Sequence, residues 1–424
     1  MIKRWFVSHS NSPVGIPMSK LGESIDYLKD LLGNDWVSRE TQSYRAWCGK
    51  HSIPFAWNFR PPNTNSLIPM FTAFDDWYGN TKKSKPPALV IDLASIAGAI
   101  SYFEPYWSSL ETDVGREHIK SYLRNAETCR GMIYELTSAF HYVRAGATPV
   151  TPLFMNPLQL DKADILITWQ EVEIEVHCKS KIPGAGNKIH ADLFDYLAGC
   201  TLAYFHKSTR KSIWLKLICD DDLRKDDVEY LRERIDSLIQ TGLVGDYPLC
   251  ENRYVLRIRE IKIPPHGITI NEIKKLHKPM YRAILADDSL SLIVGHGYYK
   301  VCVFDAVSRK RPRVASSLKD SIKQAIKQVT GKRPSIVTVH FHDPMDWEVA
   351  NKLAVFKIFL EQQLKTRRGK NVGALVLTGE PLTRDRWTGY VYERSLPAIW
   401  FFNAHSNLQV QLSATFQLSV SQTK

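Results

Sequence analysis

The spacing of apolar residues along the first 125 positions is helical. Residues 19–32 begin with a serine and carry apolar side chains at positions 21, 25, 28, 31 and 32, which predicts an amphipathic helix. Residues 91–102 and 116–123 also look helical, and the loop-forming stretches 60–67 and 79–87 interrupt the pattern. We therefore expect residues 1–125 to form a mostly helical N-terminal region.

A different order of elements follows. Residues 130–146 place apolar side chains on one stripe and end in glycine, which predicts a helix with a C-terminal stop. Strand patterns then occur at 148–154, 163–169 and 171–179, followed by a helix at 188–205 and a strand at 212–219. Helix, three-strand meander, helix and strand in this order predict an α/β sandwich.

The remainder of the chain predicts a second α/β unit. A helix is expected at 226–242, and the Pro-Pro-His-Gly turn at 264–267 is the best candidate for a domain boundary. Beyond it the patterns predict strands at 299–304, 336–341, 374–377 and 398–402, with helices at 316–329 and 346–364. The expected fold class is α/β, with a helical region at 1–125, a sandwich at 126–262 and a C-terminal α/β domain at 268–424.

Composition narrows the class of protein. The chain has 424 residues, of which 44% are apolar and 24% charged, as in ordinary globular proteins. The longest apolar stretch, residues 88–100, is too short to cross a bilayer, and the N-terminus lacks the apolar core of a signal peptide. Seven cysteines without a CxxC pair fit a reducing compartment. We expect a cytoplasmic protein without membrane contact.

The net charge of +12 favours a polyanionic partner, nucleic acid first, although many basic proteins bind no particular anion. Basic clusters occur at 82–85, 206–211, 309–313 and 365–370, each at the end of an element or in a loop.

Candidate chemistry gathers around the strand EVEIEVHCK at 171–179. Alternation places Glu173, Glu175, His177 and Lys179 on one face of this strand. Asp164 opens the preceding strand, and side chains on neighbouring antiparallel strands lie roughly 5 Å apart. Grouped carboxylates bind Mg²⁺, and a nearby lysine stabilises the charge that develops when a phosphodiester is hydrolysed.

Glu135 in IYELTSAFHYVRAG, Asp164 in KADILI and Lys179 in EVHCKSK together resemble the PD-(D/E)XK nuclease superfamily. The resemblance covers residues 130–220. It implies a restriction-endonuclease-like core and hydrolysis of DNA with Mg²⁺ or Mn²⁺ as cofactor. Asp164 is then the principal metal ligand, Glu135 supports the metal or its water, and Lys179 stabilises the transition-state charge.

One position departs from the family pattern. His177 stands two residues before Lys179, where the family has Glu or Gln. His177 is then itself a metal ligand, or Glu175 replaces the missing carboxylate, or the site has lost its metal and retains only nucleic-acid binding.

The expected function is that of a metal-dependent DNA endonuclease, in restriction, transposition, repair or anti-phage defence. The alternatives are a catalytically lapsed nucleic-acid-binding subunit of a larger assembly and, less favoured, a ribonuclease. Double-strand cutting commonly needs two sites, which suits a homodimer, with the C-terminal domain and the helical N-terminus supplying recognition or dimer contacts. The residues expected to contact phosphates are Lys181, Lys188, Lys207, Arg210 and Lys211.

Overall fold

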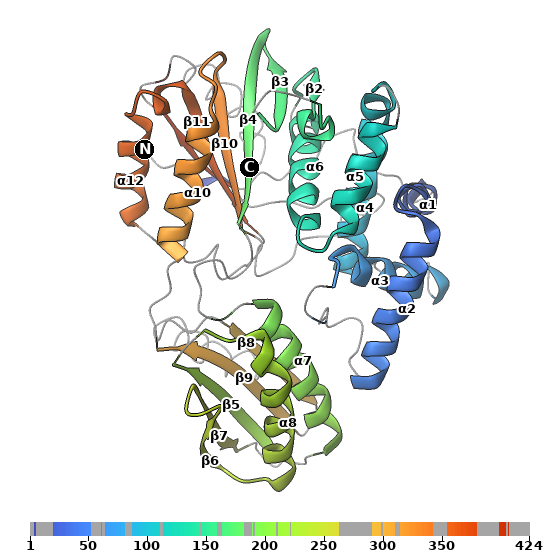
Figure 1. The fold of residues 1–424 in the computed structure, drawn as a ribbon, viewed down its shortest axis with the longest axis vertical. Helices are drawn as coiled ribbons and strands as arrows, with labels where there is room; N and C mark the ends of the chain where they lie inside the picture. The colour runs from blue at the N-terminus through green and yellow to red at the C-terminus, as the bar shows by residue number, and fades with distance from the viewer. Residues whose placement is uncertain are drawn as a thin grey trace, which may run out of the picture. The chain divides into compact units, whose positions relative to one another are not determined.

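The chain forms two compact units, each with its own mixed α/β architecture (Figure 1). Unit 1 comprises residues 1–43, 63–182 and 316–424, and unit 2 comprises residues 44–62 and 183–315. The computed structural model describes residues 4–5, 20–51, 61, 64–80, 87–110, 113–144, 146–158, 163–181, 189, 191–208, 211–220, 222–262, 291–297, 300–309, 314–341, 354–379, 398–403 and 406.

The N-terminal part is helical, as predicted. The apolar stripe of the first helix is buried at all five expected positions, 21, 25, 28, 31 and 32, because this face packs against other helices of unit 1. The second and third helices were not anticipated from the sequence. The helices are α1 (Leu21–Leu32), α2 (Asn34–His51), α3 (Leu67–Asn80), α4 (Ala88–Ser108), α5 (Val114–Arg124) and α6 (Cys129–Arg144).

A seven-stranded mixed sheet forms the centre of unit 1, in the order β1-β12-β11-β10-β4-β3-β2. Strands β4, β10 and β11 are parallel, and the other neighbours pair antiparallel. All residues of β10 are buried, as expected for a strand covered on both faces. The strands are β1 (Arg4–Trp5), β2 (Val150–Thr151), β3 (Ile165–Trp169), β4 (Val172–Lys181), β10 (Ser335–Phe341), β11 (Val372–Gly379) and β12 (Ala398–Phe402).

The strand that continues this sheet beyond β4 comes from the C-terminal part of the chain. The sequence placed the 212–219 strand in the same sandwich as the 171–179 strand. The strand β5 (Ser212–Cys219) exists as predicted but belongs to the sheet of unit 2, whereas β10 pairs with β4, with Ser335 beside Glu175. Parallel neighbours need a crossover connection, and here residues 182–334 supply it. The structure therefore divides the chain differently from the three predicted regions, because the expected C-terminal domain completes the sheet of the candidate site.

Helices cover both faces of this sheet. The ring of Tyr134 on α6 stacks on His340, with ring centroids 4.6 Å apart, and His340 lies beside Ser180 in the register. On the other face Glu175 meets Thr330, which follows α10 (Val314–Gln328). Since alternate residues of a strand point to opposite faces, α6 and the end of α10 lie on opposite sides of β4, as Figure 1 shows. Helix α12 (Ala354–Leu364) connects β10 to β11.

Unit 2 is built on a five-stranded sheet of order β6-β7-β5-β9-β8. Its core joins one face of the sheet to two helices, through residues such as Phe194, Leu231, Leu215 and Phe304. The predicted turn at 264–267 lies outside the described residues. The further elements are α7 (Ala191–Ser208), α8 (Lys225–Thr241), β6 (Gly245–Leu249), β7 (Tyr254–Ile261), β8 (Ser291–Gly297) and β9 (Lys300–Ser308).

The strand predicted at 148–154 is shorter than expected. Only Val150–Thr151 pairs as β2, and residues Leu153–Met155 form a 3-10 turn. Pro152 lies between them and has no N–H to donate to a ladder. Over the described part of the chain, no helix combines the length and the apolar character needed to cross a membrane.

Candidate functional site

The candidate site begins where β3 and β4 separate. Their antiparallel register ends at Ile165 and Val176, while β4 continues to Lys181 alongside β10. At this point the Asp164 carboxylate oxygen Oδ2 accepts a hydrogen bond from the Cys178 N–H at 2.6 Å. A side-chain oxygen thus takes the place of a backbone acceptor at the end of the ladder, and this bond holds the Asp164 carboxylate against β4.

Glu135 and Lys179 interact electrostatically with the Asp164 carboxylate. The pKa of Glu135 is raised to about 8, mainly by burial and also by the charge of Asp164, while the ammonium of Lys179 opposes both effects. Burial also raises the pKa of Asp164, while the Cys178 N–H and Lys179 lower it. Glu135 on α6, Asp164 at the start of β3 and Lys179 on β4 therefore lie close enough to affect one another electrostatically, and all three are partly buried.

The carboxylates of Glu135 and Asp164 both have raised pKa values, so binding of a cation between them is favourable, because a positive charge stabilises their ionised forms. Mg²⁺ is commonly held by one or two carboxylates, with water and substrate phosphates completing its shell. Glu135 and Asp164 fit such an open site. Among the described residues, no group of three or more His, Cys, Asp and Glu side chains is arranged to hold a metal ion, so the protein alone offers no closed cage there.

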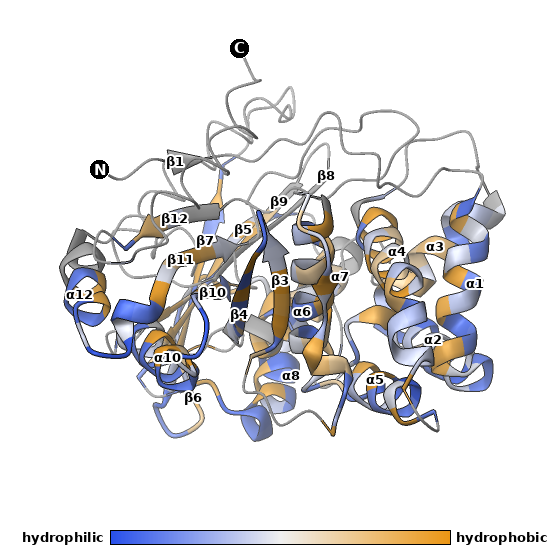
Figure 2. Cartoon of the chain, turned by 90° about the horizontal axis from the view of Figure 1, so that it is seen from above, coloured by the Kyte–Doolittle hydropathy of each residue, from blue (hydrophilic) through white to orange (hydrophobic). Residues whose placement is uncertain are grey.

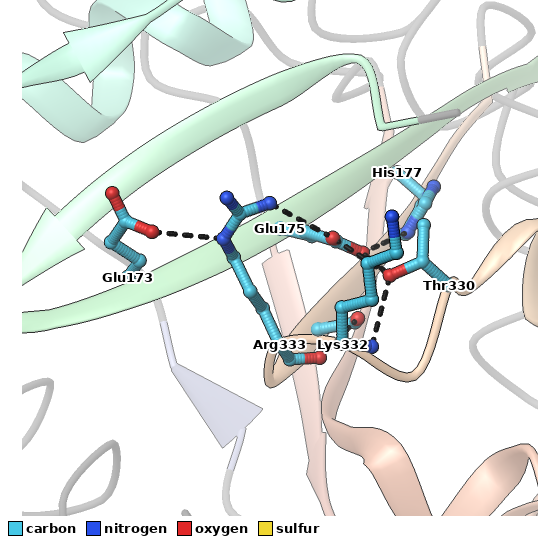
Figure 3. A network of polar contacts seen from close by, with 7 residues as sticks. Glu173, Glu175, His177, Thr330, Lys332 and Arg333 are labelled. Atoms are coloured by element: carbon cyan, nitrogen blue, oxygen red, sulfur yellow. Dashed lines mark hydrogen bonds and ion pairs between the residues drawn. The ribbon is translucent and has the colours of Figure 1, made fainter. Parts of the chain in front are cut away.

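Glu175 and His177 belong to a second network, drawn in Figure 3. The Glu175 side chain is 1% exposed, and its two carboxylate oxygens accept from the Thr330 hydroxyl at 2.8 and 3.0 Å. The Arg333 guanidinium lies 3.5 Å from Glu175 and donates to Glu173 at 2.8 Å. His177 is fully buried, with its Nε2 atom 3.6 Å from Glu175 Oε2.

The sequence left two residues, Glu175 and His177, as alternatives for the second metal ligand, and both belong to this second network. Both oxygens of Glu175 are already engaged, and a guanidinium compensates its charge. In Figure 2 the hydrophilic colour recurs along β4, whose polar residues alternate with apolar ones, whereas the neighbouring β3 is mostly in the hydrophobic colour. The ligand roles of Glu175 and His177 stay predictions. Glu175 joins β4 to the turn after α10 through Thr330 and Arg333, and His177 lies beside Glu175 on the same strand.

Sequence reasoning missed Thr330 and Arg333. They lie 155 and 160 residues from their partners Glu175 and Glu173, and no local pattern indicates a contact over that separation. The buried carboxylate itself was the available signal, because a buried charge needs a partner.

The residues predicted to contact phosphates divide between the two units. Lys181 ends β4 in unit 1, whereas Lys207 lies on α7 in unit 2, and neither side chain is described. Lys188 and Arg210 lie outside the described residues. Lys211, also in unit 2, is exposed and lies 3.7 Å from Glu260. Closeness in sequence to the candidate site therefore does not place Lys207 and Lys211 in its unit.

Comparisons with known proteins do not assign the chain to a family. A scan against protein-family models found no matching family, and searches of curated proteins and of solved structures found no similar chain or fold.

Proposed function

We propose that the chain is a metal-dependent endonuclease of the PD-(D/E)XK kind that hydrolyses phosphodiester bonds of DNA. The observation that carries this proposal is the convergence of Glu135, Asp164 and Lys179 at the point where β3 and β4 separate. Two carboxylates and one ammonium in a partly buried site are suited to bind a cation and a phosphate together.

The order of elements supports the same proposal. The resemblance takes residues 130–220 as a helix, a three-strand meander, a helix and a strand, but the last two of these elements, α7 and β5, belong to unit 2. Unit 1 presents α6, then β2, β3 and β4, then α10 and β10. Unit 2 is inserted in the chain between β4 and α10, which separates the second half of the motif from the first by more than 130 residues.

Each residue has a defined part in the proposed chemistry. Asp164 and Glu135 hold the cation, and the Cys178 N–H fixes the orientation of Asp164. Lys179 places a positive charge beside both carboxylates, where it stabilises negative charge on a bound phosphate. A bound Mg²⁺ or Mn²⁺ supplies Lewis-acid activation of the phosphate and of the attacking water.

A second candidate function is nucleic-acid binding without cleavage, as a subunit of a larger assembly. The observation that favours it is the Glu175–His177 network. The strand position at which the family pattern has Glu or Gln is filled by a buried histidine, beside an already engaged carboxylate.

The test is cleavage of supercoiled and linear DNA in Mg²⁺, in Mn²⁺ and in EDTA. The wild type is compared with Asp164→Ala, His177→Ala and Lys179→Ala. Metal-dependent cutting that is lost in Asp164→Ala and Lys179→Ala supports the nuclease. Salt-sensitive DNA binding without cutting in either metal supports the second candidate, and cutting that persists in all variants refutes the assignment of the site.

A further inference from the structure

Two segments of unit 1 carry most of the excess positive charge. Residues 314–333 and 354–371 contain ten basic and two acidic residues, a net charge of +8, against +12 for the whole chain. They comprise α10, α12 and the turns that follow these helices. Among the described residues, Lys179 is the cation that acts on Glu135 and Asp164, and it lies outside these two segments.

The two segments form one continuous surface. The ammonium groups of Lys319 and Lys323 on α10 lie 5.3 and 5.8 Å from the ring centroid of Phe359 on α12. At the other end of α10, the Arg368 guanidinium donates to the Lys327 carbonyl at 2.7 Å. A Cβ added at Gly331 would meet the Asn371 side chain at 2.8 Å, so the turn after α10 lies against the segment after α12.

Three lysines are evenly spaced along α10. Lys319, Lys323 and Lys327 are four residues apart, so they follow one face of the helix at roughly 6 Å intervals. Figure 2 shows hydrophilic residues on α10 and on the segment after α12. We define the α10–α12 basic surface by six exposed residues: Lys323, Lys327, Lys332, Arg367, Arg368 and Lys370.

The basic side chains of the α10–α12 surface differ from the arginines of unit 2 in whether they form ion pairs. In unit 2 the arginines at 253, 257 and 259 each bind a carboxylate, with donor–acceptor distances from 2.5 to 3.1 Å. Within the part of the chain that the structure describes, Lys327, Lys332, Arg367 and Lys370 form no ion pair. A cluster of like charges without internal compensation is unfavourable by itself and becomes favourable when a polyanion binds.

The surface is tied to the strand of the candidate site. The Lys332 backbone N–H donates to Thr330 Oγ1 at 3.1 Å, and this hydroxyl donates to Glu175 on β4 (Figure 3). Lys179 is four residues further along the same strand. The position of the turn is thus fixed relative to β4 by hydrogen bonds.

We propose that the α10–α12 basic surface binds the phosphate backbone of duplex DNA, without reading its sequence. The identification of the polyanion as DNA rests on the proposed nuclease function, whereas the position of the surface follows from its charge and exposure. Contacts of lysine and arginine with phosphates release counterions, so binding there weakens steeply as salt rises.

The experiment measures binding of a fluorescein-labelled 30-base-pair duplex by fluorescence anisotropy, in EDTA and over a series of salt concentrations. The surface variant is K327E/K332E/K370E. The control variant is K20E/R39E/K50E, which changes three exposed basic residues outside the two basic segments and alters the net charge equally. A milder variant, K327Q/K332Q/K370Q, removes the charges without reversing them, and circular dichroism verifies that each variant is folded.

We expect the surface variant to bind about 100-fold more weakly than the control at 0.1 M salt, with a salt slope lower by about three, one for each phosphate that the variant no longer neutralises. The glutamine variant changes in the same direction by less. Equal affinities of surface and control variants overturn the proposal, as does a wild type that binds single-stranded RNA or anionic vesicles but not the duplex. Because the assay contains no metal, weakened binding in the surface variant supports the inference even if the wild type never cuts DNA.

Discussion

The buried carboxylate of Glu175 depends on a hydroxyl from the turn after α10, and Thr330→Val removes that hydroxyl at nearly constant volume. Thr330 Oγ1 is within 2.8 and 3.0 Å of the two Glu175 oxygens, and the Glu175 side chain is 1% exposed, so water does not readily replace the missing donor. Hydrogen bonds to charged groups contribute about 1.5–3 kcal/mol. Arg333, 3.5 Å from Glu175, retains part of the compensation, so we expect a decrease of about 2 kcal/mol in the free energy of unfolding.

Thr137→Val is the matched control. Thr137 is also a partly buried threonine of unit 1, but its hydroxyl donates to the carbonyls of Ile133 and Tyr134 in its own helix, and we expect a change below about 0.5 kcal/mol. Urea unfolding monitored by circular dichroism and tryptophan fluorescence compares the two variants with the wild type. A Thr330→Val variant as stable as Thr137→Val would refute the reasoning that this hydroxyl compensates the Glu175 charge.

Three further predictions concern pH, metal and backbone conformation. Burial raises the pKa of Asp236 on α8 to about 7, with Arg232 opposing and Glu233 adding to the shift, so its stabilising contribution is present at acidic pH and has been lost once the pH rises through about 7. At pH 4 we therefore expect Asp236→Asn to melt at nearly the same temperature as the wild type. At pH 8.5 we expect it to melt at a higher temperature, with a free energy of unfolding larger by on the order of 1–3 kcal/mol after allowance for solvent screening. Equal melting temperatures of the two proteins at both pH values contradict this. Mg²⁺ in roughly tenfold excess over its Kd is expected to raise the melting temperature of the wild type by about 2–5 °C and to leave Asp164→Asn almost unchanged, and an equal rise in both would place the cation elsewhere. Gly331 has φ +74°, and a Cβ added there would lie 2.8 Å from the side-chain nitrogen of Asn371, so Gly331→Ala should lower stability by about 1–2 kcal/mol in urea unfolding. Gly131→Ala on α6, where a Cβ meets nothing within 4 Å, should stabilise by up to about 1 kcal/mol.

Local pattern was sufficient for most individual elements. The stripe at 21, 25, 28, 31 and 32 predicted α1, and the alternation in EVEIEVHCK predicted β4, because each depends only on residues within a few positions. Helix α2 was missed because it is rich in polar residues and lacks a clear apolar stripe.

The order of the strands in the sheet could not be predicted from local sequence patterns. Strands β5 and β10 both follow a helix and both contain buried apolar residues, so nothing within either strand shows which one pairs with β4. The choice depends on contacts between residues more than 150 positions apart, such as Glu175 with Thr330. Glu135, Asp164 and Lys179 were singled out through their resemblance to the PD-(D/E)XK pattern, all of which lies within one stretch of 45 residues.

The central claim is that the chemistry belongs to Glu135, Asp164 and Lys179, while Glu175 and His177 hold the fold. The most direct test is the rate of DNA cleavage in Mg²⁺ for Glu135→Gln, Asp164→Asn, Glu175→Gln and His177→Gln, each expressed per folded protein. We expect the first two variants to cut at least about 1000-fold more slowly than the wild type and the last two to stay within about tenfold of it. Cutting that persists in Glu135→Gln and Asp164→Asn but disappears in Glu175→Gln or His177→Gln would contradict the account.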